Sequence, residues 1–206
     1  MIKKQNYLKH AIVLFLLLLL MQPERAWAAY ENVEFSSLTN HDGLTNSQVG
    51  AILKDTRGYI WFGTQSGLCR FDGFRMKTFY YSNTDDKSLP NNSVDELQQD
   101  YDGNIWVHTS VGYSIYKYDE EQFDRKPEKW LKNIHVQGPP YKLLIDKDKN
   151  MWIAVYGQGL FFHNAKTKNT YLFKFTKKAQ PGCLKEGNIS KITEVDGDAL
   201  ITYNDG

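Results

Sequence analysis

The sequence predicts an all-β protein made of β-propeller blades of four antiparallel strands, about three complete and a fourth truncated, in an incomplete ring. The first observation is a repeat, in which Trp61, Trp106 and Trp152 are separated by 45 and 46 residues. The second is that each repeat holds short runs of branched and aromatic residues between Asp- or Gly-bearing turns, a pattern typical of strands. Four strands in about 45 residues is the size of one blade.

The N-terminal segment predicts export. Lys3 and Lys4 precede an apolar run at residues 11–21, and small residues follow at Ala26 and Ala28. This order of charged, apolar and small residues is typical of a secretory signal peptide, here residues 1–28. An uncleaved anchor or lipid-facing helix is the alternative. We expect residues 29–206, a partial β-propeller with no membrane span of its own, to lie outside the cytoplasm.

The repeats divide residues 29–206 into blades. In the first blade we expect strands at residues 49–55, 59–64, 68–72 and 75–81. Consecutive apolar residues within these runs indicate strands that are buried on both faces. The predicted blades cover residues 44–82, 89–136, 140–176 and, truncated, 187–206. Residues 33–38 resemble an outermost strand, and we assign them to a last blade that this chain does not contain.

Each repeat also has an aspartate six residues before its tryptophan, and a glycine three residues after the aspartate in the first two copies. Asp and Gly at these positions favour a type I turn, so we interpret them as hairpin corners instead of calcium loops or catalytic acids. Lys149 replaces the glycine in the third copy. We interpret the tryptophans as wedges between sheets instead of sugar-stacking residues. The predicted structural repeat is Asp55, Gly58, Trp61, Asp100, Gly103, Trp106, Asp146 and Trp152.

Composition restricts the function classes. The chain has 206 residues, a net charge of +1, 41% hydrophobic and 14% aromatic residues. This is a globular composition without the positive field that nucleic-acid binding needs. Cys69 and Cys183 lie at non-equivalent repeat positions, so we expect unpaired, inert thiols. No residue spacing predicts a metal site, and we expect no cofactor.

Two stretches resemble a known family. "LTNSQVGAILKDTRGYIWFGTQSGLCRFDG" (Leu44–Gly73) and "LPNNSVDELQQDYDGNIWVHTSVG" (Leu89–Gly112) closely resemble the two-component regulator propeller repeat. The resemblance implies the N-terminal periplasmic sensor region of a Bacteroidetes hybrid two-component system, which detects glycan breakdown products and controls polysaccharide-utilisation genes. Its relatives are longer, with two seven-bladed propellers, a membrane helix, a histidine kinase and a DNA-binding domain. The kinase is absent from this sequence, so we expect a non-catalytic fragment.

Five residues are candidates for contact with an oligosaccharide. His108 occupies the position of Gly63 in the first copy and Ala154 in the third, so a bulky group replaces small ones. Tyr113, Tyr156 and Gln158 lie in or beside turns, as does His41, where a tyrosine offers a flat apolar face and a glutamine offers a donor and an acceptor. The alternative for His108 is a hydrogen-bonded histidine beside a strand end, with no base or metal as partner.

Two other functions remain open. A propeller lyase or glycoside hydrolase would need paired carboxylates or a His–Tyr constellation, whereas the acids here lie mostly in turns and charged runs. A small exported scaffold or adhesion module, closed by oligomerisation, is the other alternative. The expected partners are therefore an oligosaccharide, the remaining blades of a longer chain, or other copies of this chain.

Overall fold

The computed structural model describes residues 35–177, 183–185 and 187–204. The chain divides into two units, and the described helices and strands all lie in the second, Leu38–Gly206. The predicted signal peptide lies outside the described residues, as do residues 33 and 34. Residues 35–38 form no strand, so their assignment to a further blade stays a prediction.

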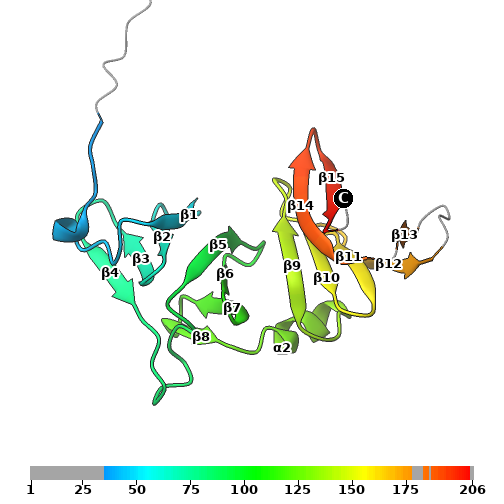
Figure 1. Cartoon of the computed structure of the whole chain (residues 1–206), viewed down its shortest axis with the longest axis horizontal. Helices are drawn as coiled ribbons and strands as arrows, with labels where there is room; N and C mark the ends of the chain where they lie inside the picture. The colour runs from blue at the N-terminus through cyan, green and yellow to red at the C-terminus, as the bar shows by residue number, and fades with distance from the viewer. Residues whose placement is uncertain (1–34, 178–182, 186, 205–206) are drawn as a thin grey trace, which may run out of the picture. The chain divides into compact units, whose positions relative to one another are not determined.

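Four sheets follow one another along the second unit (Figure 1). Two have four antiparallel strands in chain order: β1 (Val49–Lys54), β2 (Ile60–Thr64), β3 (Gly67–Phe71) and β4 (Met76–Phe79), then β5 (Val94–Gln99), β6 (Ile105–Thr109), β7 (Gly112–Lys117) and β8 (Gln122–Asp124). The third contains β9 (Pro140–Ile145), β10 (Met151–Val155), β11 (Gly159–His163), β12 (Thr170–Thr176) and the short parallel β13 (Leu184–Lys185). The fourth contains β14 (Ile189–Val195) and β15 (Asp198–Tyr203). These sheets confirm the predicted fold class.

Short helices occupy the connections. They are the 3-10 helices η1 (Asn40–Asp42) and η2 (Lys132–Ile134) and the α-helix α2 (Glu128–Leu131). The repeat pattern predicted none of them. Leu131 and Ile134 are buried in the cluster that joins the second and third sheets, so this helical connection is part of the core.

The aspartate of each repeat holds its turn together. Asp55 Oδ1 accepts hydrogen bonds from the backbone N–H groups of Arg57, at 2.9 Å, and Tyr59, at 3.0 Å. Asp100 accepts the same pair of bonds in the second repeat. The fourth turn residue has a positive φ, +92° at Gly58 and +66° at Lys149, where a side chain is strained. The turn chemistry thus fixes the hairpin between the first two strands of each blade.

The second carboxylate oxygen of each aspartate binds the tryptophan of the same repeat. The bonds from indole Nε1 to Oδ2 are Trp61 to Asp55 at 2.6 Å, Trp106 to Asp100 at 2.9 Å and Trp152 to Asp146 at 3.4 Å. A buried indole N–H needs an acceptor, and the carboxylate supplies it. The six-residue spacing between aspartate and tryptophan therefore serves this hydrogen bond between the two side chains, which the turn pattern alone does not reveal.

The tryptophans lie between consecutive sheets. Trp61 packs in one cluster with residues of the second sheet, such as Leu97 and Val107. Trp106 clusters with residues of the third sheet in the same way, and Trp152 with residues of the fourth. Trp61 and Trp106 are fully buried, whereas Trp152 is only half-buried. Each repeat thus completes its core with the next one, as in propeller and repeat proteins.

Candidate functional site: a tyrosine platform at one end of the blades

Four of the five candidate ligand residues lie at one end of the second and third sheets. Antiparallel pairing places the turn between the second and third strands of a blade at the same end as the start of the first strand. His108 and Tyr113 flank the turn between β6 and β7, while Tyr156 and Gln158 lie in the turn between β10 and β11. The connections between blades reach the same end, because each leads into the next first strand.

A β-bulge at this end redirects one side chain of each first strand. In β5 the register with β6 shifts between Val94 and Glu96, which leaves Asp95 without a partner in β6. In β9 the register with β10 shifts between Pro140 and Lys142, which leaves Tyr141 without a partner in β10. The first strands β1 and β14 are irregular at the equivalent place. Bulges commonly re-aim side chains beside functional sites. In the second and third blades they provide a carboxylate and a phenol ring.

Tyr141 and Tyr156 form a stacked pair. Their ring centroids are 4.1 Å apart with an angle of 19° between the planes. Tyr156 is 63% exposed although it is a large aromatic residue. Tyr141 is half-buried, its hydroxyl accepts a bond from Ile189 N–H at 3.3 Å, and burial raises its pKa. One ring is therefore anchored in the protein and supports another that is open to a ligand. We call this pair the tyrosine platform.

Two hollows adjoin the tyrosine platform. One of about 340 Å³ is lined by His108, Tyr113 and the two platform tyrosines, with residues of the connection between the second and third sheets. The other, of about 690 Å³, is lined by the platform, Gln158, Lys174 and residues such as Asn188. The structure thus brings His108, Tyr113 and Tyr156 to one hollow, and Tyr156 and Gln158 to the other. Concave sites of this size suit a small ligand.

His108 has an acidic partner. Its Nδ1 lies 2.6 Å from Asp95 Oδ1, and its ring centroid is 4.4 Å from that of Tyr113. The expectation that no base pairs with His108 is therefore wrong. The sequence could not reveal this pair, because it depends on the bulge that exposes Asp95 between two paired residues.

Tyr113 and Gln158 are both held by neighbours. The Tyr113 hydroxyl donates to Glu96 Oε2 at 2.8 Å and accepts from Leu143 N–H at 3.1 Å, and burial beside Glu96 raises its pKa. Gln158 Nε2 donates to the Gln137 carbonyl at 2.6 Å. Tyr113 is buried, so it forms a wall of the smaller hollow. Gln158 connects its turn to the chain that enters the third sheet.

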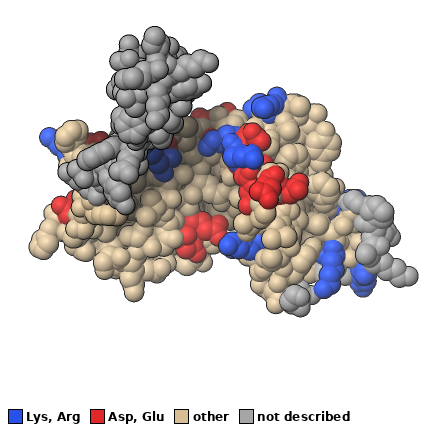
Figure 2. Space-filling view, turned by 90° about the horizontal axis from the view of Figure 1, so that it is seen from above, with Lys and Arg blue, Asp and Glu red and all other residues tan. Residues whose placement is uncertain are grey.

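Other features limit the chemistry. His41 lies in η1 and lines neither of these hollows. Cys69 is buried and Cys183 half-buried, and both are free. Among the described residues, no group of His, Cys, Asp and Glu is arranged to hold a metal ion, and no helix is long and apolar enough to cross a membrane. Figure 2 shows basic and acidic side chains scattered over the face seen from above.

Comparison with known proteins identifies the repeats. The four successive sheets define a β-propeller repeat protein. Residues 43–66 and 88–110, which lie in the first two repeats, match the two-component regulator propeller family, so these two repeats are similar to that family. The matches include the first two Asp–Trp pairs.

Individual relatives are similar over limited parts. Histidine kinase P4 of Formosa agariphila is 41% identical over 61 residues, which is 30% of this chain and 4% of that protein. The extracellular domain of a hybrid two-component system from B. thetaiotaomicron superposes with a TM-score of 0.55 at 23% identity, covering 82% of this chain and 24% of that one. The extracellular domain of a one-component system from the same organism gives 0.50 at 16%, covering 82% and 25%. The chain thus spans a small part of each relative, and the solved structures support the fold.

Proposed function

We propose that this chain is a non-catalytic part of the periplasmic sensor region of a hybrid two-component system that responds to a glycan, and that its export depends on the N-terminal signal peptide. The family of its repeats and the extracellular location of the similar solved domains support this proposal. The kinase that would transmit the signal belongs to a longer protein. The control of polysaccharide utilisation is the output expected of such a system.

The observation that carries the ligand proposal is the exposed, stacked ring of Tyr156. The flat apolar face of a pyranose packs against such a ring, and polar groups around it orient the sugar hydroxyls. Gln158 and Lys174 line the larger hollow beside the ring. The supporting ring of Tyr141 reduces the conformational entropy that binding would otherwise cost.

The acids near the tyrosine platform support a binding role over catalysis. Asp95 pairs with His108, and Glu96 accepts from Tyr113 at 2.8 Å while its other oxygen lies 3.3 Å from Lys142 Nζ. A hydrolase needs two carboxyl groups available at the scissile bond. Asp95 and Glu96 thus already have partners, and among the described residues Glu128 is the one acid that lines either hollow, so the site is better suited to holding a sugar than to cleaving one.

The test is calorimetric titration of the protein with a panel of neutral and acidic oligosaccharides. We expect one class to bind, and we expect Tyr156→Ala to weaken that binding about tenfold, which is about 1.4 kcal/mol. Tyr171→Ala is the matched control, because Tyr171 is also exposed, at 52%, and stacked on an aromatic ring, but lies outside both hollows. An equal loss in the two variants, or no binding by any oligosaccharide, would count against the tyrosine platform.

A second candidate function is an exported scaffold that assembles with further blades, either of a longer chain or of other copies. Its support is the exposure of apolar residues on the first and fourth sheets, Ile52 at 67% and Leu200 at 54%. Large exposed apolar areas mark interaction surfaces. Light scattering during size-exclusion chromatography tests the version with identical copies, which predicts one defined oligomer. A monomer that binds an oligosaccharide would favour the sensor.

A further inference from the structure

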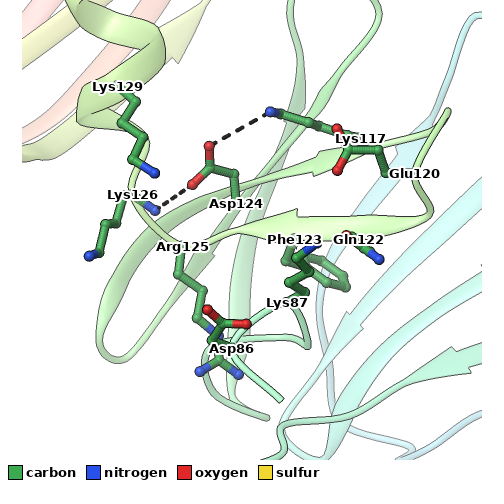
Figure 3. Close-up of a pocket in the computed structure, with 10 residues that line it drawn as sticks. All are labelled: Asp86, Lys87, Lys117, Glu120, Gln122, Phe123, Asp124, Arg125, Lys126 and Lys129. Atoms are coloured by element: carbon green, nitrogen blue, oxygen red, sulfur yellow. Dashed lines mark hydrogen bonds and ion pairs between the residues drawn. The ribbon is translucent and has the colours of Figure 1, made fainter.

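A separate hollow of about 370 Å³ lies at the outer edge of the second sheet (Figure 3). It shares only Arg125 with the hollows beside the tyrosine platform. Three segments line it: the loop that enters the second sheet, the β7–β8 hairpin, and the chain from Arg125 to Lys129 that leads into α2. The first and the last of these segments are far apart in the sequence, so the fold itself assembles this hollow.

The lining is rich in charged side chains with an excess of basic ones. Its acidic residues are Asp86, Glu120 and Asp124. Its basic residues are Lys87, Lys117, Arg125, Lys126 and Lys129. Five positive and three negative charges leave a net charge of +2, whereas the whole chain has +1. The local excess favours an anion.

One of the three acids is already engaged by the protein. Asp124 Oδ2 lies 3.7 Å from Lys117 Nζ, and Asp124 Oδ1 accepts a bond from the backbone N–H of Lys126 at 2.9 Å (Figure 3). The other two acids, Asp86 and Glu120, lie well apart in Figure 3, one from the loop and one from the hairpin. They therefore do not form a common acidic centre that would attract a cation.

Three of the lysines are uncompensated. Within residues 35–177, 183–185 and 187–204, no ion pair joins Lys87, Lys126 or Lys129 to an acid. Each comes from a position that borders the same hollow. In Figure 3 the side chains of Lys126 and Lys129 lie apart from that of Lys87, so the three stems must turn inward to contact one ligand. An ammonium group on a flexible stem can do so, because it binds an oxyanion as a point charge.

The backbone around the hollow is held in place by Arg125. Its guanidinium donates to the carbonyls of Ser82 (3.1 Å), Asp85 (2.9 Å), Ser88 (2.9 Å) and Leu89 (3.2 Å), and to Ser88 Oγ at 2.6 Å. The backbone N–H of Phe123 also donates to the Lys87 carbonyl at 2.8 Å. These bonds tie the loop to the hairpin and to the start of α2. The positions that carry the free lysines are thus fixed before any ligand arrives, which lowers the cost of binding.

We propose that this hollow binds a small ligand through a dianionic oxyanion group, a phosphate monoester. The site is distinct from the tyrosine platform, so a failure of the protein to bind oligosaccharides would leave this proposal unaffected. The net charge of +2 and the three free ammonium groups match a doubly charged group better than a single carboxylate.

The test is a titration of the full ¹⁵N-labelled chain with sodium sulfate, and separately with sodium phosphate, at an ionic strength held constant with sodium chloride. We expect saturable shifts of the backbone amides at Lys126 and Lys129 with either ion. The double variant Lys126→Gln/Lys129→Gln should weaken the affinity about tenfold. Phosphate should bind at least as tightly as sulfate, and equal binding shows that the double charge is what the site recognises. A clear preference for sulfate would overturn the assignment to a phosphate ester.

The matched control is Lys54→Gln/Lys166→Gln, which removes the same charge from exposed lysines outside the hollow. It should bind sulfate and phosphate as the natural chain does. Shifts that grow linearly without saturation, or an equal loss of affinity in both double variants, would overturn the proposal, since each would indicate general screening of surface charge.

Discussion

Replacement of Asp100, which binds the buried indole of Trp106, should destabilise the protein much more than replacement of Asp146, which binds the half-buried indole of Trp152. In Asp100→Ala, the Trp106 N–H loses an acceptor at 2.9 Å, and Trp106 is 1% exposed, so water cannot replace it. An unsatisfied buried donor costs about 1–3 kcal/mol. The turn also loses bonds from the backbone N–H groups of Asp102 and Asn104, each about 1 kcal/mol. The expected loss is about 3–5 kcal/mol.

The equivalent change in the third repeat provides the internal comparison. Trp152 is half-buried and its bond to Asp146 is 3.4 Å long, so water can take over part of it in Asp146→Ala. Of the turn amides, the backbone N–H of Asn150 loses its bond to Asp146 Oδ1. We expect a loss of about 1–2 kcal/mol.

Urea denaturation followed by circular dichroism measures both free energies of unfolding. A double-mutant cycle with Trp106→Phe isolates the bond between the carboxylate and the indole, and we expect a coupling energy of about 1–3 kcal/mol. Equal losses for Asp100→Ala and Asp146→Ala, together with a coupling energy near zero, would show that the carboxylate does not stabilise the protein by binding the buried tryptophan.

Three further predictions concern stability. Burial lowers the pKa of His163, whose Nε2 is buried without a hydrogen-bond partner, so the neutral ring contributes to stability above the unfolded pKa and this contribution is lost as the pH falls. The melting temperature should therefore drop less between pH 7 and 5 in His163→Phe than in the natural chain, and an equal drop would contradict this. Gly159→Ala should lower the free energy of unfolding, measured by urea denaturation, by at least about 2 kcal/mol. The added Cβ would lie 2.2 Å from the Phe173 carbonyl oxygen, and the φ of +137° is unfavourable for a residue with a side chain; unchanged stability would contradict this geometry. Arg125→Lys should increase the rate of amide hydrogen exchange in residues 82–89, since one ammonium group cannot replace the guanidinium that binds four carbonyls of this loop. Exchange at the natural rate would show that Arg125 does not hold the loop.

The repeat made the blades predictable, since Asp, Gly and Trp at fixed spacing specify a turn and an interblade residue together. What it did not reveal depends on pairing across strands. Asp95 meets His108 because of a bulge, and a bulge leaves no signal in the local pattern of apolar residues. The short helix α2 was missed for a similar reason: four residues are too few for helical periodicity, and burial of Leu131 stabilises them.

The candidate site was predictable in part. Tyr156 was identified from its place in a turn, but Tyr141 was not, because its phenol ring reaches Tyr156 only through the irregular start of β9. The hollow lined by Lys87 and Lys129 was also missed. Its residues belong to charged runs that are indistinguishable in sequence from a solvated surface, and only the fold brings them together.

The proposal that this chain belongs to a sensor is tested most directly by sequencing the genomic DNA immediately downstream of the Gly206 codon. We expect the reading frame to continue into further Asp-x-x-Gly-x-x-Trp repeats, a membrane helix and a kinase. A stop codon directly after Gly206 would contradict the sensor proposal for this polypeptide and leave the exported scaffold as its function.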